Sequence, residues 1–326
     1  MRTQYAPANY PPRARGFTIL EVMIALTAGL LILLALTEVF TNNSRTRGEL
    51  EKTNRQTENG RYAMTLLSNE LSNAGFFAEA GEQIASGTLP DECDPSTSAS
   101  NDDYIQNLFG YPIQGGNNIT TAPTCLTDFK TGNDFIAIRR SSSCAVDSGS
   151  GCDAFLPNAY HLQVSACQTD DPGEIFSAST ALISGMTATA KDCSTRAPVY
   201  RLFDRIYFIT ADNILSRAEL GANTVYSVTP LVDGIEALHF EYGIDTDNNG
   251  EPDLFTSTPT AAQWPNAVAV RVWLIVRSLE SSPGHLDSRS YVLGNETAIT
   301  FNDSFKRQMY STTVRINNVA GRREQP

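Results

Sequence analysis

The sequence predicts an α+β protein in which one long N-terminal α-helix precedes an antiparallel β-sheet head with long, disulfide-bonded loops. Three observations support this prediction. An apolar run fills residues 17–40, segments of alternating polarity without intervening helices follow in the second half of the chain, and six cysteines lie between residues 93 and 193. Strands that are not separated by helices favour antiparallel pairing.

The N-terminal helix is predicted from its hydrophobicity and from the absence of proline. Residues 17–40 read FTILEVMIALTAGLLILLALTEVF, a stretch about 36 Å long as a helix, enough to cross a hydrocarbon core of about 30 Å. No proline occurs between Pro12 and Pro90, so the helix can continue as far as residue 73. Its second part carries apolar residues on one face, suited to packing on a sheet: Ala63, Leu66, Leu67 and Leu71.

The flanks of the apolar run distinguish an anchor from a cleaved secretory signal. Arg13 and Arg15 precede the run, and the positive-inside rule therefore puts the N-terminus in the cytoplasm and the head outside. A secretory signal peptide would have a shorter apolar core, closed by a small-residue cleavage site. The run here is longer and no such site follows it, so a membrane-spanning first half of the helix is expected.

In the head, regular elements are expected mainly after residue 133. Residues 76–133 are rich in Ser, Thr, Asn, Asp, Gly and Pro, a composition typical of loops. Alternating polarity predicts strands over 134–140, 200–210, 214–220, 238–244, 266–279 and 311–319. His239 lies on the polar side of its strand and is expected at the surface.

The cysteines indicate an oxidising compartment. An even number beyond a membrane-targeting segment favours disulfides, and the chain has no Cys-x-x-Cys pair that would favour a metal site. Their spacing leaves the pairing open, and neighbour pairing is our working hypothesis: Cys93–Cys125, Cys144–Cys152 and Cys167–Cys193.

Composition and motifs argue against nucleic-acid binding and against catalysis. The formal net charge is −12, which repels a phosphate backbone, and no basic stripe offsets it. The three histidines, His161, His239 and His285, are scattered. The sequence contains no G-x-S-x-G, H-E-x-x-H or P-loop motif, so we expect a protein that is not an enzyme and has no organic cofactor.

One acidic segment suggests calcium. Oxygen ligands recur at the spacing with which an EF-hand loop begins, with Gly250 at its sixth position. The side-chain ligands would be those of Asp245, Asp247, Asn249 and Asp253. Glu251 at the seventh position would contribute its backbone carbonyl oxygen. Thr256 occupies the twelfth position, where an EF-hand has glutamate. The alternative is a β-turn without metal, because Asp, Asn and Gly favour turns by themselves.

The segment Arg15-Gly16-Phe17-Thr18-Ile19-Leu20-Glu21 begins the apolar run. Thr18 and Glu21 have the spacing of a helix capping box. The whole segment resembles the class III signal of type IV prepilins and type II secretion pseudopilins. This resemblance implies that a prepilin peptidase cleaves between Gly16 and Phe17 and methylates Phe17. It also implies that Glu21 pairs with the α-amine of an adjacent subunit.

The chain as a whole resembles the PilW group of minor pilins. The resemblance rests on the N-terminal helix, the variable cysteine-bearing middle, the EYGIDTDNNGEPD segment, the Val-rich strand and the closing FKRQMYSTTVRINNV. It implies a leader over residues 1–16, a transmembrane pilin helix over 17–75 and a periplasmic or extracellular head over 76–326.

The same resemblance implies a function and partners. Such a protein would be anchored in the bacterial inner membrane, help to initiate pilus assembly and sit in a tip complex at the cell surface. Its partners would be other minor pilins, the major pilin, the inner-membrane assembly platform and a tip adhesin. The alternatives are a type II secretion minor pseudopilin and a tip binding or adhesion module.

Overall fold

The computed structural model describes residues 16–80, 88–93, 107–108, 110–169 and 182–324, together with the backbone of a strand at 175–179. The predicted leader, apart from Gly16, lies outside these residues. The chain divides into two units, residues 1–51 and residues 52–326, which are considered separately.

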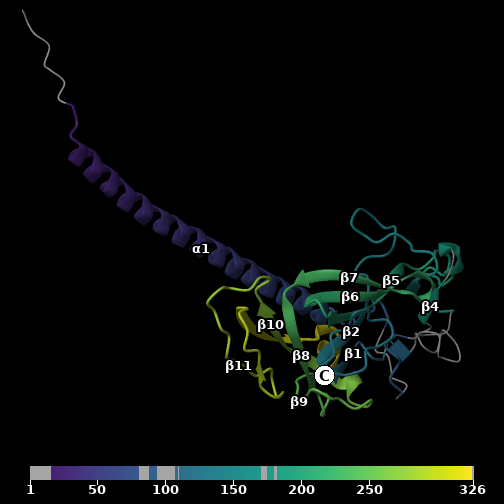
Figure 1. The fold of residues 1–326 in the computed structure, drawn as a ribbon. Helices are drawn as coiled ribbons and strands as arrows, with labels where there is room; N and C mark the ends of the chain where they lie inside the picture. Colours follow the sequence, from purple (N-terminus) through teal and green to yellow (C-terminus); the bar gives the residue numbers. More distant parts are fainter. Residues whose placement is uncertain are drawn as a thin grey trace, which may run out of the picture. The chain divides into compact units, whose positions relative to one another are not determined.

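A single helix, α1 (Ile19–Ser72), runs through 54 residues (Figure 1). In the first unit it is the exposed apolar segment. In the second unit it contributes the predicted apolar face to the head, where Ala63, Leu67 and Leu71 are fully buried in the main hydrophobic core. Gln56 anchors the start of this packed part, because its Nε2 donates to the carbonyl oxygens of Val276 at 2.7 Å and Lys306 at 3.0 Å.

The first sheet of the head has seven antiparallel strands. Its main path is β1–β2–β5–β3–β4, with β6 beside β5 and β7 beside β6. The strands are β1 (Ile113–Ile119), β2 (Asn133–Ser141), β3 (Tyr160–Val164), β4 (Ile175–Ser179), β5 (Val199–Ile209), β6 (Ile214–Leu220) and β7 (Tyr226–Asp233).

The second sheet has four antiparallel strands in the order β13–β10–β8–β9. They are β8 (Ile235–Ile244), β9 (Leu254–Thr256), β10 (Ala267–Arg277) and β13 (Arg307–Arg315). A small hairpin pairs β11 (Ser290–Tyr291) with β12 (Ile299–Thr300). The short remaining elements are η1 (Ile183–Gly185), η2 (Ala222–Thr224), η3 (Trp264–Asn266) and the C-terminal helix α3 (Asn317–Arg323).

The main core lies where α1 and the inner faces of the two sheets meet. The strand β10 contributes Val270, Val272, Leu274 and Val276 to it, the face predicted from its alternation. The outer face of the same sheet is covered as well, because Ile275 and Ala237 pack against Tyr291 and Leu293 of the segment between β10 and β13. The central strands β8 and β10 are therefore largely buried on both faces of the sheet.

The C-terminal helix closes the end of α1. Asn318 Nδ2 donates to the carbonyl oxygen of Ala74 at 3.1 Å, and Arg322 Nη2 donates to that of Gly75 at 2.6 Å. Both carbonyl groups lie just beyond the helix, whose last residue is Ser72. Gly75 has a φ of 73°, the left-handed conformation with which many helices end.

The cysteines form three disulfides between neighbours in the sequence, Cys93–Cys125, Cys144–Cys152 and Cys167–Cys193. They enclose short stretches, with sequence separations of 32, 8 and 26 residues. The bonds thus fasten the loop-rich part of the head, while β8, β10 and β13 contain none.

The α+β fold with its antiparallel sheets and three disulfides is confirmed, and three details of the prediction were wrong. His239, expected at the surface, is only 2% exposed because the segment between β10 and β13 covers its face of the sheet. The last strand was predicted over 311–319 but ends at Arg315, after which α3 begins. The loop-rich stretch 76–133 contains β1, whose composition, IQGGNNI, gives little strand signal.

Candidate functional site

The start of α1 is a helix cap formed by two side chains. The Glu21 N–H donates to Thr18 Oγ1 at 3.2 Å, while the Thr18 N–H donates to Glu21 Oε2 at 2.9 Å. The Thr18 hydroxyl donates to the same carboxylate oxygen at 3.0 Å. This is the reciprocal capping box expected from the spacing, and it satisfies amide groups that have no partner within the helix.

The helix surface around this cap is apolar and uncovered. Phe17 is 86% exposed, Ile19 82% and Leu26 68%, and the apolar side chains farther along are exposed to a similar degree. The segment reaches a mean hydropathy of 2.6 over eighteen residues and is long enough to cross a membrane. Within the described residues of this unit, Glu21 and Glu38 are the only carboxylates between residues 16 and 48. The first unit thus offers a long apolar rod with one acidic side chain near its tip.

The arrangement has a clear electrostatic consequence. A carboxylate in a lipid or protein interior costs several kcal/mol unless a cation accompanies it. Among the residues that the structure describes, Glu21 has only the Thr18 groups as partners, and Thr18 is neutral. Its charge therefore remains uncompensated wherever the apolar surface becomes buried.

The acidic segment after β8 forms a compact turn, in which carboxylate oxygens of Asp245, Asp247 and Asp253 approach within 4.8 Å of one another. Asp245 accepts backbone N–H groups from Asn248 at 2.6 Å and Gly250 at 2.9 Å. The other two predicted ligands, Asn249 and Glu251, are bonded to each other, because the Glu251 N–H donates to Asn249 Oδ1 at 2.7 Å.

A cation already lies against this turn. Arg323 of α3 donates from Nη1 to Asp245 Oδ2 at 3.1 Å and from Nη2 to Asn266 Oδ1 at 2.6 Å. Burial tends to raise the pKa of Asp245, but hydrogen bonds from Gly250 and Arg323 hold that pKa below its usual value. A calcium ion would therefore have to bind beside Arg323, a residue that local sequence gave no reason to include.

The histidines do not form a catalytic group. His161 is fully buried and its Nδ1 lies 3.0 Å from the Ala159 carbonyl oxygen. His239 Nδ1 lies 2.9 Å from Asp134 Oδ2 in the covered outer face of the second sheet. His285 lines a different feature, an open groove of about 580 Å³ beside α1.

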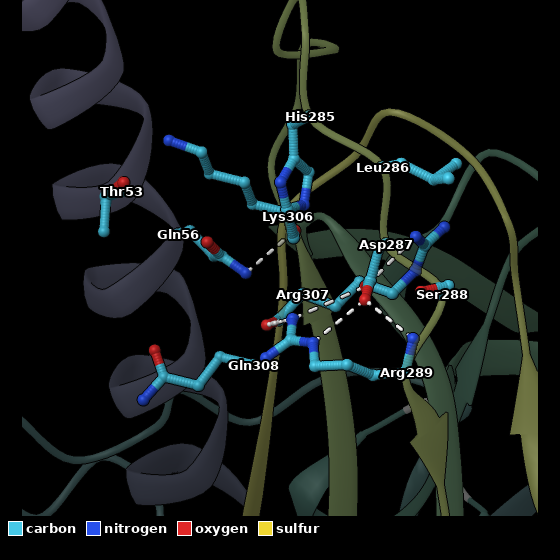
Figure 2. Close-up of a pocket in the computed structure, with 10 residues that line it drawn as sticks. All are labelled: Thr53, Gln56, His285, Leu286, Asp287, Ser288, Arg289, Lys306, Arg307 and Gln308. Atoms are coloured by element: carbon cyan, nitrogen blue, oxygen red, sulfur yellow. Dashed lines mark hydrogen bonds and ion pairs between the residues drawn. The ribbon is translucent and has the colours of Figure 1, made fainter.

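This groove lies between the packed part of α1 and the segment before β11 (Figure 2). Its floor is built around an ion-pair network. Arg307 has no exposed side-chain surface and donates to Glu236 Oε1 at 3.0 Å and to Asp303 at 2.6 and 2.7 Å. Asp287 lies 3.6 Å away and accepts from Arg289 at 2.9 Å.

The charged groups of this network are paired with one another. None of these pairs is arranged for acid–base chemistry. Although burial tends to raise it, hydrogen bonds from Arg289 and Tyr291 lower the pKa of Asp287 to about 2. The Asp287 carboxylate is thus held in its charged form beside Arg307. The groove is therefore a structural feature of the head.

Two known families match separate parts of the chain. Residues 206–318 match the family described as type IV pilus-assembly protein W, PilW. Residues 11–37 match the prokaryotic N-terminal methylation motif. None of the curated proteins compared with the chain matches it.

Proposed function

The chain belongs to the PilW family of type IV pilus-assembly proteins and carries the N-terminal methylation motif, and from this premise we propose that it is a minor pilin. It is a structural protein and not an enzyme. Its hydrophobic helix anchors it in the inner membrane before it enters a pilus. In this proposal it helps to initiate pilus growth and sits in a complex at the tip.

The proposed processing concerns the first residues. Prepilin peptidase cuts between Gly16 and Phe17, removes the leader over residues 1–16 and leaves Phe17 as the methylated N-terminus. The exposed helix start supports this step, because a Cβ added at Gly16 would meet no atom within 4 Å and Phe17 is 86% exposed. Residues 17–75 then form the pilin helix, and residues 76–326 form the head outside the cytoplasm.

The observation that carries the proposal is the Glu21 carboxylate near the start of the apolar helix. Once the helix leaves the lipid and packs among other pilin helices, Glu21 needs a cation. The α-amine created by cleavage is such a cation, and in a filament the amine of an adjacent subunit can supply it. Pairing a buried carboxylate with a buried ammonium group offsets much of the cost of burying either one.

Two substitutions separate this role from helix capping. Glu21→Gln keeps a side chain that can cap the helix but removes the charge. Thr18→Ala keeps the charge but removes the cap. We expect Glu21→Gln to be processed and inserted normally and to be absent from sheared pili, whereas Thr18→Ala still enters them. Glu38→Gln serves as the control for loss of charge elsewhere on the same helix.

Mass spectrometry of the mature protein completes the test. A methylated Phe17 at the N-terminus is the expected result for the wild type and for all three variants. An uncut chain, or a cut near residue 40, would contradict the proposed processing. Pili that contain Glu21→Gln protein at the wild-type level would contradict the proposed role of the carboxylate.

A further inference from the structure

The strand β13 is a long edge of the second sheet. It has nine residues, and among the described elements its pairing partner is β10 alone. Antiparallel pairing alternates between residues that bond to the neighbour and residues whose N–H and C=O groups point away. The Ser278 N–H donates to the Lys306 carbonyl oxygen, and the Ile316 N–H donates to that of Val268. Even-numbered residues of β13 therefore face β10.

The odd-numbered residues direct their backbone groups outward. Beyond Arg307 they are Met309, Ser311, Thr313 and Arg315, and each of them is exposed. Within the described part of the chain, no hydrogen bond to the backbone of these four residues is recorded. Their side chains lie on the opposite face from Tyr310 and Val314, which pack in the core. β13 thus presents an ordered row of free donors and acceptors.

Three other edges of the two sheets, β1, β7 and β9, have features that β13 lacks. β7 contains Pro230 and a register shift, both of which hinder the addition of another strand. β1 has a register shift after Gly116, and β9 is only three residues long. Edges left without such protection commonly accept a strand from another chain.

The surroundings of the edge indicate the chemistry of the partner. Five apolar side chains of β13 and of the segment between β10 and β13 are each at least 38% exposed: Leu279, Leu286, Val292, Ile299 and Met309. An exposed arginine lies at each end. Arg315, 45% exposed, pairs with Glu324 at one end, and Arg289, 60% exposed, donates to the Arg307 carbonyl oxygen at 2.8 Å at the other.

At its first residues the edge joins the groove in Figure 2, which Gln308 lines together with Arg289. The carboxylate of Asp287 in this groove has no exposed surface. The charge that a strand entering the groove would meet first is therefore the cationic Arg289. An acidic side chain at that end of the strand would find a partner there.

We propose that the free edge of β13 receives an extended, acidic segment of a different polypeptide by β-strand addition. A second copy of this chain is a poor occupant. The register that would pair the whole edge with another β13 brings Arg315 opposite Arg307, and like charges directly opposite each other destabilise a strand pair. The inference does not depend on Glu21 or on cleavage at Gly16.

Amide hydrogen exchange at single-residue resolution tests the proposal directly. The full-length protein is measured alone in detergent and again after purification together with the pilus-assembly subunits of its own host. We expect the amides of Ser311 and Thr313 to slow at least about tenfold in the complex, while those of Tyr310 and Thr312, already bonded to β10, change little. Equal rates at Ser311 and Thr313 in both samples would overturn the proposal, as would slowing in a concentrated sample of the protein alone.

A pair of proline variants adds a functional measurement. Ser311→Pro removes an outward N–H and leaves the ladder to β10 intact, so the head should fold and its association with partner subunits should fall at least about tenfold. Thr312→Pro removes an inward N–H and should disrupt the head itself. Folded Ser311→Pro protein that still co-purifies at the wild-type level would overturn the proposal. If Ser311→Pro fails to fold, the exchange measurement decides alone. Normal processing at Phe17 in this variant separates its effect from a failure of membrane anchoring.

Discussion

Arg307 holds a buried ion-pair network together, and its replacement by methionine should strongly destabilise the head. The guanidinium group is fully buried, bonds Glu236 and Asp303, and lies over the Phe301 ring at 3.8 Å. Methionine keeps much of the apolar volume but removes every one of these bonds. The substitution therefore isolates the charge interaction from packing.

The expected loss of unfolding free energy depends on the partners that each carboxylate retains in the variant. Asp303 is 37% exposed and can return to water, and Asp287 keeps Arg289 and Tyr291. Glu236 is 7% exposed and, among the described residues, keeps one ion pair, with Arg277 at 3.5 Å. Breaking a buried ion pair costs about 3–5 kcal/mol. Because one partner remains, we expect about 3 kcal/mol, or a melting temperature lower by about 6–12 °C for a head of this size.

Thermal and urea unfolding of the full-length protein in detergent, followed by tryptophan fluorescence, measures this loss. Arg315→Met is the matched control on the same strand, because its pair with Glu324 is about half exposed and should contribute at most about 1 kcal/mol. The double variant Arg307→Met/Glu236→Leu should recover most of the loss, since no buried charge remains unpaired. A single variant as stable as Arg315→Met, or a double variant no better than the single one, would refute the reasoning.

Two further predictions concern other charged groups. Burial tends to lower the pKa of His239, but its hydrogen bond to Asp134 and the nearby carboxylates raise that pKa above its ordinary value. The stabilisation from the protonated imidazole is therefore complete at low pH and is lost as the pH rises through the folded-state pKa. His239→Gln should flatten the curve of unfolding midpoint against pH, and a curve parallel to that of the wild type would contradict this. If the turn at Asp245 binds calcium, calorimetry of the wild type should give a dissociation constant of about 10⁻⁴–10⁻³ M. Asp245→Ala should abolish this binding, and an absence of heat with the wild type would end the hypothesis.

The parts of the fold that could be predicted are those specified by patterns among neighbouring residues in the sequence. The apolar run, the capping spacing of Thr18 and Glu21, and the alternation of Val270, Val272 and Leu274 each depend on neighbours in the sequence. Such features led directly to the helix, its start and the main strands.

What could not be predicted depends on residues far apart in the chain. His239 was expected at the surface because nothing near it in the sequence reveals that Tyr291 and Leu293 cover its face of the sheet. The contact of Arg323 with Asp245 joins residues 78 positions apart, and the pair of Arg307 with Glu236 spans 71. The outward direction of the backbone N–H and C=O groups at odd-numbered residues of β13 can be derived only from the register of β13 with β10.

The closure of α1 by α3 has a consequence for the order in which contacts form as the head folds. The carbonyl groups of Ala74 and Gly75 accept hydrogen bonds from Asn318 and Arg322 of α3, which lie 244 and 247 positions later in the sequence. The burial of Leu67 and Leu71 in the main core does not need these bonds. A chain shortened before Asn318 would therefore keep the apolar contacts of α1 but lose both hydrogen bonds beyond its end.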